Sequence, residues 1–349
     1  MKVSIWHNNE DIRIEEVPTP KPGPKEMLVK VISCGICGSD IVEWYRLPRA
    51  PLVQGHEIGG EVVEVGESIK NYRPGDRVCV APKVPCMNCY YCENGHYPVC
   101  SNVKDRLPGG FAEYILVPEA LMERGTYRLP ENMTYDQSTF IEPLACVVRA
   151  QNLAGIKKGE TVLVMGCGMS GLLHVKLAKT KGCKIIATDL NGKRLKYAEK
   201  IGADITIDAA DNVPERLMAE HHKKADVVIL CTSANSAIDQ AWKSVDKGGS
   251  IVFFAVPGPN REVVIPINDF WTKEIKILTS YYCGPPDIME AIKLLETGTI
   301  EVDDMITHRL PLEDITKGFR LVIEGKESIK VIIKPNEGIK TLEASEKAE

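Results

Sequence analysis

A glycine-rich turn at residues 166–171 constrains the fold of this chain more than any other sequence feature. It follows an apolar run at Thr161–Met165 that predicts a strand, and it opens a predicted helix at Leu172–Lys181. The first glycine permits the tight turn, the second lets the backbone approach a pyrophosphate, and the third lets helix and strand pack closely. The free N–H groups of the helix N-terminus favour the phosphates. The predicted phosphate-binding residues are Gly166, Gly168, Met169, Ser170 and Gly171.

An acidic residue at the end of the next predicted strand strengthens this interpretation. The strand covers Lys184–Asp189, and Asp189 follows Gly166 at the spacing that a dinucleotide site requires. A carboxylate there can accept both ribose hydroxyls and would repel a 2′-phosphate, so we expect NAD rather than NADP. Lys193 and Arg194 begin the next predicted helix, where they either reach the nucleotide or are solvated surface cations. A tight turn beside an unrelated surface aspartate is the alternative, and it does not explain the paired spacing.

Length and sequence texture divide the chain into two expected domains. Its 349 residues exceed the about 100 to 200 residues of a typical domain. Residues 1–150 are rich in Gly and Pro with short β-branched runs, which predicts a mostly β domain. Residues 151–284 alternate strands and helices, which predicts an α/β domain with a doubly wound parallel sheet. Residues 285–349 do not resemble another βαβ unit and are expected to return to the first domain, with residues 335–349 as a disordered tail.

The elements expected within these domains follow from apolar runs between turn signals. Strands are predicted at residues 27–32, 60–65, 77–80, 226–230, 250–256, 304–309 and 328–334, and helices at 193–200 and 287–296.

Composition limits the partners and the compartment of the protein. The chain is 44% hydrophobic and 26% charged with a formal net charge of -5, so it lacks the basic excess that nucleic acid attracts. The N-terminus turns polar at once, and no run approaches the ~18 apolar residues of a membrane span. We therefore expect a cytoplasmic protein with no nucleic-acid or membrane partner. In a reducing compartment the twelve cysteines favour metal ligation over disulfides.

Four of these cysteines are closely spaced. They are Cys86, Cys89, Cys92 and Cys100. Four thiolates within 15 residues are enough for a closed tetrahedral zinc site, which leaves no position for a substrate. The spacing therefore predicts a structural zinc that fixes a loop.

A second set of potential zinc ligands is dispersed along the chain. Cys37, the His56-Glu57 pair and Glu142 are each weak signals, because a lone cysteine or carboxylate is more often structural than catalytic. Together, in a chain with a dinucleotide domain, they supply the mixed sulfur, nitrogen and oxygen ligands of an open catalytic zinc site. The sequence thus predicts two zinc ions per chain.

These motifs together resemble the zinc-containing medium-chain dehydrogenase family, nearest to its sorbitol-type and L-threonine dehydrogenase branches. The resemblance covers residues 1 to about 334 and includes the motifs at Gly35–Asp40, Gly55–Glu57, Gly109–Tyr114 and Glu142-Pro143, beside the cysteines and the glycine turn. It implies a GroES-like catalytic domain, split in sequence and completed by the C-terminal segment, with a Rossmann cofactor domain inserted and the active site in the cleft. It also implies a homo-oligomer, with a tetramer expected.

The resemblance assigns roles to individual residues. Cys37 and His56 are implied zinc ligands, with Glu142 or Glu57 filling the coordination and water or substrate in the open position. Asp40 matches the carboxylate that orients the histidine ligand. Ser39 matches the hydroxyl that takes the alcohol proton. The implied reaction is hydride transfer between NAD and a secondary alcohol or ketone, with zinc as the Lewis acid.

One departure from the family bears on the proton route. Polyol and threonine dehydrogenases usually carry a His two residues after the aspartate of the first motif, where this chain has Val42. Glu43 follows, and if residues 39–46 are helical it shares a face with Ser39 at i, i+4 spacing. Glu43 is then expected either to accept the proton or bind the substrate, or to be a solvated helix charge.

The substrate class and two competing functions remain open at this level. The short connection between Cys37 and His56 suggests an open cleft that suits a polyol, a cyclic polyol or a sugar derivative, and an amino alcohol such as L-threonine is the alternative. A zinc-free quinone or enone reductase on the same fold would not need the ligand set. A non-catalytic NAD-binding protein is the alternative of another class, since fold alone does not establish function.

Overall fold

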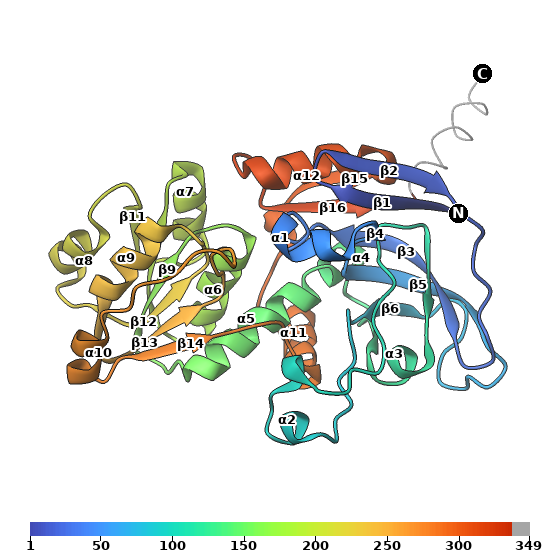
Figure 1. Cartoon of the computed structure of the whole chain (residues 1–349), viewed down its shortest axis with the longest axis horizontal. Coiled ribbons are helices and arrows are strands. Elements are labelled where there is room, and N and C mark those ends of the chain that lie inside the picture. The colour runs from blue at the N-terminus through green and yellow to red at the C-terminus, as the bar shows by residue number, and fades with distance from the viewer. Residues whose placement is uncertain (337–349) are drawn as a thin grey trace. The chain divides into compact units, whose positions relative to one another are not determined.

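The computed structural model describes residues 1–336, and most of the expected tail, residues 337–349, lies outside this part of the chain. The chain forms two compact units (Figure 1). Unit 1 contains Met1–Pro143 and the segment from Gly284 onward, and unit 2 contains Leu144–Cys283. The first break therefore falls inside helix α5 (Ile141–Ala154), whereas the sequence analysis puts the domain boundary at residues 150/151.

Unit 2 is built on a parallel sheet with the strand order β11-β10-β9-β12-β13-β14. The strands are β9 (Thr161–Met165), β10 (Lys184–Asp189), β11 (Ile205–Asp208), β12 (Ala225–Leu230), β13 (Val245–Phe253) and β14 (Lys276–Thr279). The order reverses between β9 and β12, which is the switch point at which such sheets bind ligands. This topology confirms the predicted doubly wound α/β fold.

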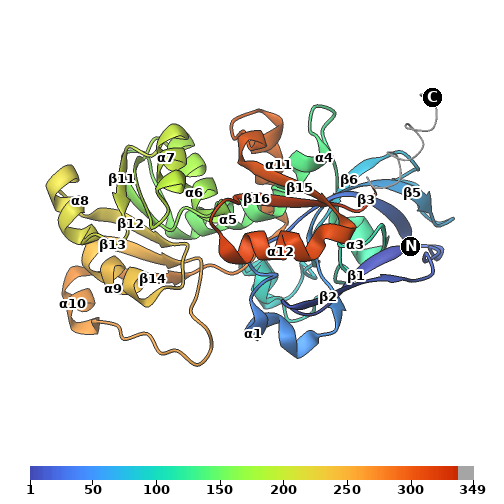
Figure 2. The ribbon, with the colours of Figure 1, turned by 90° about the horizontal axis from the view of Figure 1, so that it is seen from above.

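Helices cover both faces of this sheet, as Figure 2 shows for α6 and α7 on one face and α9 on the other. The helices are α6 (Met169–Thr180), α7 (Gly192–Lys200), α8 (Val213–His221), α9 (Asn235–Ser244) and α10 (Ile267–Lys273). Because helices screen both faces, a central strand needs no polar face, and all five residues of β9 are buried.

Unit 1 is mostly β structure. Its larger sheet has the order β15-β16-β3-β5-β6-β8, with β7 also paired to β3, and a smaller sheet has the order β2-β1-β4. The strands are β1 (Lys2–Asn8), β2 (Asp11–Glu16), β3 (Met27–Gly35), β4 (Leu52–Val53), β5 (Glu57–Val65), β6 (Arg77–Val80), β7 (Tyr114–Val117), β8 (Thr126–Arg128), β15 (Ile306–Pro311) and β16 (Lys330–Lys334). The core side chains include Trp6, Phe111 and Phe319.

The helices of unit 1 are short, apart from α11 and α12 near the end of the described chain. They are α1 (Glu43–Arg46), α2 (Tyr90–Glu93), α3 (Glu119–Arg124), α4 (Tyr135–Ser138), α11 (Pro285–Glu296) and α12 (Ile315–Glu324), with 3-10 turns at η1 (Leu47–Arg49), η2 (Tyr97–Val99), η3 (Asp303–Met305) and η4 (Leu312–Asp314). The helix considered for residues 39–46 is wrong, because α1 begins only at Glu43. Among the described residues, no helix is long and apolar enough to cross a membrane.

The C-terminal strands complete the sheet of unit 1. Strand β16 pairs antiparallel with the end of β3, where Ile333 faces Cys34, although nearly 300 residues separate them in sequence. A buried carboxylate reinforces this junction: Asp136 of α4 accepts hydrogen bonds from Ser33 Oγ at 2.6 Å, Lys334 Nζ at 2.8 Å and Arg309 Nε at 2.6 Å. Burial raises the pKa of Asp136, but these three donors outweigh burial and lower it. Asp136 therefore joins β3, β15 and β16 in its ionised form.

We predict that Asp136→Asn destabilises the protein, because it leaves the buried ammonium of Lys334 without its carboxylate. The midpoint of thermal unfolding should fall by at least about 5 °C at pH 7. Because the pKa of Asp136 is lower in the folded state than its unfolded value of about 3.9, its carboxylate stabilises the fold at pH values above about 4. This stabilisation is lost as the pH falls further, so the difference in midpoint between the variant and wild type should shrink below about pH 4. Asp11→Asn, which breaks an exposed ion pair with Arg13, is the control and should change the midpoint by less than about 1 °C. Equal midpoints for the Asp136 variant and wild type would contradict this role.

Candidate active site and zinc-binding residues

The four closely spaced cysteines converge in the loop that carries α2 and η2. Their sulfur atoms all lie within 4.8 Å of one another. The Cys89–Cys92, Cys89–Cys100 and Cys86–Cys100 sulfur pairs are separated by 3.6, 3.9 and 3.5 Å. A tetrahedral zinc with Zn–S bonds of about 2.3 Å requires sulfur separations of about 3.8 Å. The loop therefore has the dimensions of a closed zinc-thiolate site.

The chemistry of these thiols also fits a metal rather than disulfides. All twelve cysteines lie in the described part of the chain, and none of them forms a disulfide there. The pKa of Cys89 is lowered to about 5, first because the backbone N–H of Cys92 donates to its sulfur and then through Ser101. A thiol that is already ionised near neutral pH is a ready zinc ligand.

The dispersed residues Cys37, His56 and Glu57 also come together. Strand β3 ends at Gly35, two residues before Cys37, and β5 begins at Glu57, immediately after His56. The two strands pair antiparallel with Gly35 opposite Glu57, so the sheet register brings these side chains to one place. One potential ligand atom from each of Cys37, His56 and Glu57 lies within 4.8 Å of the others. The arrangement supplies the sulfur, nitrogen and oxygen donors of an open zinc site.

One carboxylate oxygen of Glu57 is available to a metal ion. Its Oε2 accepts a hydrogen bond from Lys330 Nζ at 2.5 Å, and both side chains are fully buried. Its Oε1 is buried and has no hydrogen-bond partner within residues 1–336. A buried carboxylate oxygen without a partner is costly, and a zinc ion held with Cys37 and His56 would satisfy it. The residues present therefore fit the metal.

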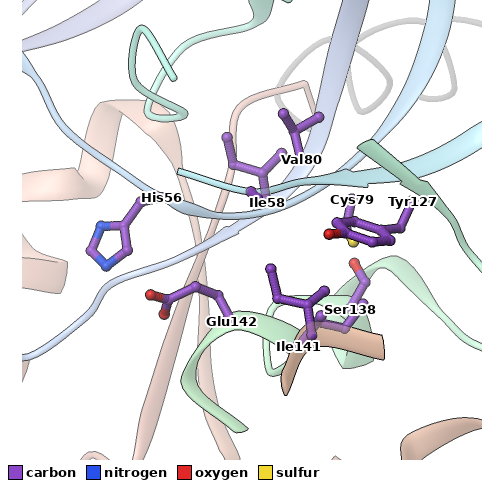
Figure 3. Close-up of a pocket in the computed structure, with 10 residues that line it drawn as sticks. His56, Ile58, Cys79, Val80, Tyr127, Ser138, Ile141 and Glu142 are labelled. Carbon is purple, nitrogen blue, oxygen red and sulfur yellow. The ribbon is translucent and has the colours of Figure 1, made fainter. Parts of the chain in front are cut away.

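Glu142 does not join this group of three. It lies in the first turn of α5 and lines a pocket of about 250 Å³ together with His56. The other lining residues are Ile58, Cys79, Val80, Ala81, Tyr127, Ser138, Ile141 and Ile288. Figure 3 shows the carboxylate of Glu142 directed toward the side of the pocket where His56 lies. Of the two glutamates that the sequence left open, the structure groups Glu57 with Cys37 and His56.

Asp40 connects the residues of this cluster. Its carboxylate is fully buried, accepts from the backbone N–H of Cys37 at 3.0 Å and lies 3.3 Å from Nδ1 of His56. Burial raises the pKa of Asp40, but His56 and Arg46 outweigh burial and lower it. Burial lowers the pKa of His56, but Asp40 and Cys37 raise it well above its usual value.

The surroundings of Ser39 differ from the sequence prediction. Ser39 Oγ lies 3.4 Å from Cys37 Sγ, next to the predicted ligands. Glu43 does not share a helical face with it, because Cys37–Asp40 form a turn and Val42 precedes the first residue of α1. Oε1 of Glu43 instead accepts from the backbone N–H of Asn9 at 3.0 Å. The geometric argument for Glu43 as proton acceptor is therefore wrong, and its carboxylate anchors α1 to the β1–β2 turn.

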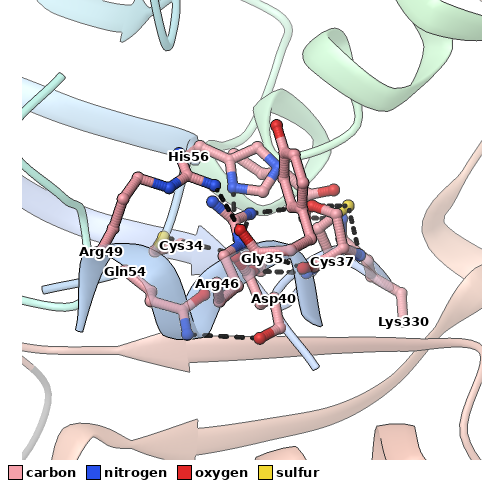
Figure 4. Close-up of polar contacts among 12 residues, drawn as sticks. Cys34, Gly35, Cys37, Asp40, Arg46, Arg49, Gln54, His56 and Lys330 are labelled. Carbon is pink, nitrogen blue, oxygen red and sulfur yellow. Dashed lines mark hydrogen bonds and ion pairs between the residues drawn. The ribbon is translucent and has the colours of Figure 1, made fainter. Parts of the chain in front are cut away.

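Two residues near the site were missed by the sequence analysis. Arg46 donates to both Ser39 and Asp40 (Figure 4). Lys330 forms the buried ion pair with Glu57 and also donates to the carbonyl of Thr139 at 3.1 Å. A lysine at the start of an apolar predicted strand was a signal that could have suggested a buried acidic partner for Lys330. No sequence pattern singles out Arg46.

In unit 2, the glycine turn has the geometry that its sequence requires. Gly166 has φ +98°, a left-handed conformation that favours glycine, and a Cβ on Gly171 would lie 1.8 Å from the carbonyl oxygen of Gly166. Asp189 Oδ2 accepts from the backbone N–H of Cys167 at 2.6 Å, so the carboxylate at the end of β10 also holds the turn. Arg194 Nη1 lies 4.0 Å from Asp189 Oδ2. The structure thus brings the predicted phosphate and ribose residues together.

Comparison with known proteins identifies two matching domain families. Residues 23–131 match the alcohol dehydrogenase GroES-like domain, and residues 171–297 match the zinc-binding dehydrogenase domain. The chain is 32% identical to sorbitol dehydrogenase of Gallus gallus, with 95% of each chain covered. It is 34% identical to erythritol/L-threitol dehydrogenase of Mycolicibacterium smegmatis, with 96% of this chain and 98% of that protein covered.

Solved structures give the same result. The 2R,3R-butanediol dehydrogenase from Bacillus subtilis matches with a TM-score of 0.84 at 31% identity, covering 96% of this chain and 99% of that chain. A zinc-binding dehydrogenase from Sinorhizobium meliloti 1021, described as putative and bound to NADP, matches with a TM-score of 0.86 at 31% identity over the same shares. These matches confirm the predicted GroES-like and Rossmann architecture.

We predict that the two ligand groups hold one zinc each and that their loss has different consequences. The purified protein should contain two zinc ions per chain by mass spectrometry of metals, because both donor sets are complete. Cys89→Ser should lose one zinc and lower the midpoint of thermal unfolding, since the closed site couples metal binding to folding. Cys37→Ser should lose the other zinc and the activity while keeping the midpoint within about 2 °C. One zinc or none in intact wild-type protein would contradict the assignment.

Proposed function

Because the chain belongs to the zinc-containing medium-chain dehydrogenase family, we propose that it oxidises a polyol, a cyclic polyol or a sugar derivative, or reduces the matching ketone, with NAD as its cofactor. The protein is a zinc-dependent oxidoreductase of secondary alcohols. The observation that carries the proposal is the group formed by Cys37, His56 and Glu57. One carboxylate oxygen of Glu57 is buried there and has no hydrogen-bond partner within residues 1–336. An inactive member of the fold has no need to keep such a costly group.

Several residues of the candidate site would each have a role in the reaction. Zinc held by Cys37, His56 and a glutamate supplies a Lewis acid that lowers the pKa of the alcohol. Asp40 orients His56 and is itself held by the backbone N–H of Cys37. Ser39 hydrogen-bonds the alcohol oxygen and passes its proton onward. NAD held by the glycine turn and Asp189 would take up the hydride from the alcohol carbon, so that loss of this hydride and of the hydroxyl proton would convert the alcohol to a ketone.

The preference for NAD rests on Asp189. Its carboxylate lies at the C-terminal end of β10 beside the glycine turn, where both oxygens already accept backbone N–H groups of Cys167 and Asn191. These bonds fix the negative charge in place, so it can accept ribose hydroxyls but repels a 2′-phosphate. Arg194, 4.0 Å from the carboxylate, offsets part of this charge, and the solved relative bound to NADP makes the preference worth measuring.

The polyol class is supported by the named activities of relatives. Sorbitol, erythritol or L-threitol, and butanediol dehydrogenases all act on compounds with neighbouring hydroxyl groups. Each is at least 32% identical to this chain over nearly its whole length. We therefore place a vicinal secondary alcohol first among the candidate substrates.

The proposed function is tested with a panel of polyols, cyclic polyols, simple alcohols and L-threonine, each with NAD and with NADP, followed by absorbance of the reduced cofactor. We expect the highest kcat/KM for a vicinal polyol with NAD, at least about tenfold above the NADP value. Asp189→Ala should reduce this cofactor discrimination. Asp208→Ala, at the paired position on β11, is the control and should leave it unchanged. A best substrate without neighbouring hydroxyls, or equal kcat/KM for both cofactors, would contradict the respective part of the proposal.

We also propose that the protein is a cytoplasmic homo-oligomer, with a tetramer as the expected form. The cytoplasmic location rests on the clustered cysteines, four of which form a group suited to metal ligation, the use of cysteine that is typical of a reducing compartment. Strand β14 lies at one end of the sheet order in unit 2, and large apolar side chains are exposed nearby in sequence, including Val264 at 85%, Ile267 at 64% and Trp271 at 81%. An open sheet edge beside exposed apolar side chains favours association.

We predict a mass by light scattering of about four times the 38.6 kDa of one chain. Trp271→Glu should reduce this mass, because it places a charge on the exposed apolar surface. Trp44→Glu, at another exposed tryptophan on α1, is the control for nonspecific effects and should leave the mass unchanged. A monomer mass for the wild type would refute the oligomer.

A further inference from the structure

The guanidinium of Arg46 makes several hydrogen bonds to residues beside the predicted zinc ligands. The side chain is only 12% exposed. Nε donates to the carbonyl oxygen of Ser39 at 3.0 Å, while Nη2 donates both to Ser39 Oγ and to Asp40 Oδ1 at 2.9 Å. Figure 4 shows Arg46 among Cys37, Asp40 and His56. One planar group thus contacts the hydroxyl next to Cys37 and the carboxylate next to His56.

Neutralising Asp40 explains only part of this geometry. A buried carboxylate needs a counter-charge, and the ion pair between Arg46 and Asp40 provides one. The bonds to Ser39 are not needed for that purpose. Because Nη2 donates to Ser39 Oγ, the hydrogen of that hydroxyl points away from Arg46, and in this structure Ser39 Oγ donates it to Cys37 Sγ at 3.4 Å. The guanidinium thus holds the Ser39 oxygen and limits the directions in which its hydroxyl can donate.

The helix that carries Arg46 is anchored independently of the site. Glu43 accepts from the backbone N–H of Asn9, and the ring of Tyr45 packs against the guanidinium groups of Arg46 at 5.1 Å and Arg49 at 4.7 Å. Arg49 Nη2 also donates to the carbonyl oxygen of Tyr45. The bond from Asn9 ties α1 to the β1–β2 turn, and the contacts of Tyr45 order the segment itself, so Arg46 reaches Ser39 and Asp40 from a held helix.

We propose that Arg46 is a positioning residue for the dehydrogenase reaction, an inference that rests on the proposed function. Its guanidinium holds the Ser39 oxygen beside Cys37 and polarises the hydroxyl, which makes the hydroxyl a stronger donor to an alcohol oxygen that binds there as negative charge develops. At the same time it holds Asp40 in the orientation that places His56.

The inference is tested with Arg46→Met, Arg46→Lys and the matched control Arg49→Met, assayed with the best substrate of the wild type. Arg46→Met should lower kcat at least about tenfold and change KM less than about threefold, since the lost interaction is made mainly in the transition state. Arg46→Lys keeps the charge, but its single ammonium nitrogen cannot reproduce the planar Nε and Nη2 geometry, so its kcat should lie between those of wild type and Arg46→Met. Arg49 packs on the same ring without touching Ser39 or Asp40, so Arg49→Met should keep kcat within about twofold of wild type.

Zinc content, thermal unfolding and chemical rescue separate positioning from a structural role. Arg46→Met should retain two zinc ions per chain, and guanidinium chloride at millimolar concentration should raise kcat of Arg46→Ala at least about threefold, more than methylammonium does. The inference would be contradicted if Arg46→Met and Arg46→Lys lost zinc or the folded state and guanidinium chloride did not rescue Arg46→Ala. That result would show that Arg46 only neutralises Asp40. A wild-type kcat in Arg46→Met would overturn the inference alone, whereas a wild type inactive on every alcohol would overturn the proposed function.

Discussion

The candidate active site depends on one buried charge, the carboxylate of Asp40. A fully buried carboxylate costs several kcal/mol unless each oxygen finds a donor. Here one oxygen accepts from the backbone N–H of Cys37, and the other meets His56 and Arg46. These three partners come from the turn after β3, the residue before β5 and the helix α1. Satisfying Asp40 therefore fixes the relative positions of a predicted sulfur ligand, a predicted nitrogen ligand and the guanidinium that holds Ser39.

The C-terminal strand β16 supplies a second set of buried charges within the larger sheet of unit 1. Strand β16 is fully buried although it begins and ends with lysines. Lys330 pairs with Glu57 and also lies over the ring of Phe140, while Lys334 pairs with Asp136. An ammonium buried in the sheet is stable only with its carboxylate, so β16 cannot leave the sheet without exposing both pairs. The carboxylate of Glu57, next to Cys37 and His56, is thus held by a segment more than 270 residues away. Unit 1 therefore needs the C-terminal segment to complete its site.

Local features were predicted from the sequence, and features that depend on the path of the chain were not. The glycine turn, the spacing of the four cysteines and the strands β6, β9 and β10 depend on neighbouring residues, so their patterns were informative. The helix considered through residues 39–46 was wrong because the Asp40 carboxylate and N–H both bond back to Cys37 and close a turn instead. The contacts of Arg46 and Lys330 follow from where α1 and β16 pack, which no local pattern specifies. The contact of Glu43 was not predicted for the same reason, since its partner Asn9 lies in the β1–β2 turn.

The two predicted zinc sites would fix a metal in opposite ways. The closed group takes all its potential ligands from one loop, and backbone N–H groups of that loop stabilise the thiolates, as at Cys89. The open group takes its potential ligands from separate segments, and Asp40 and Lys330 hold His56 and Glu57 from outside the group. Glu57 shows the consequence most clearly: Lys330 occupies one oxygen and leaves the other for the metal. Lys330 thereby fixes the orientation of a predicted zinc ligand from a strand near the other end of the described chain.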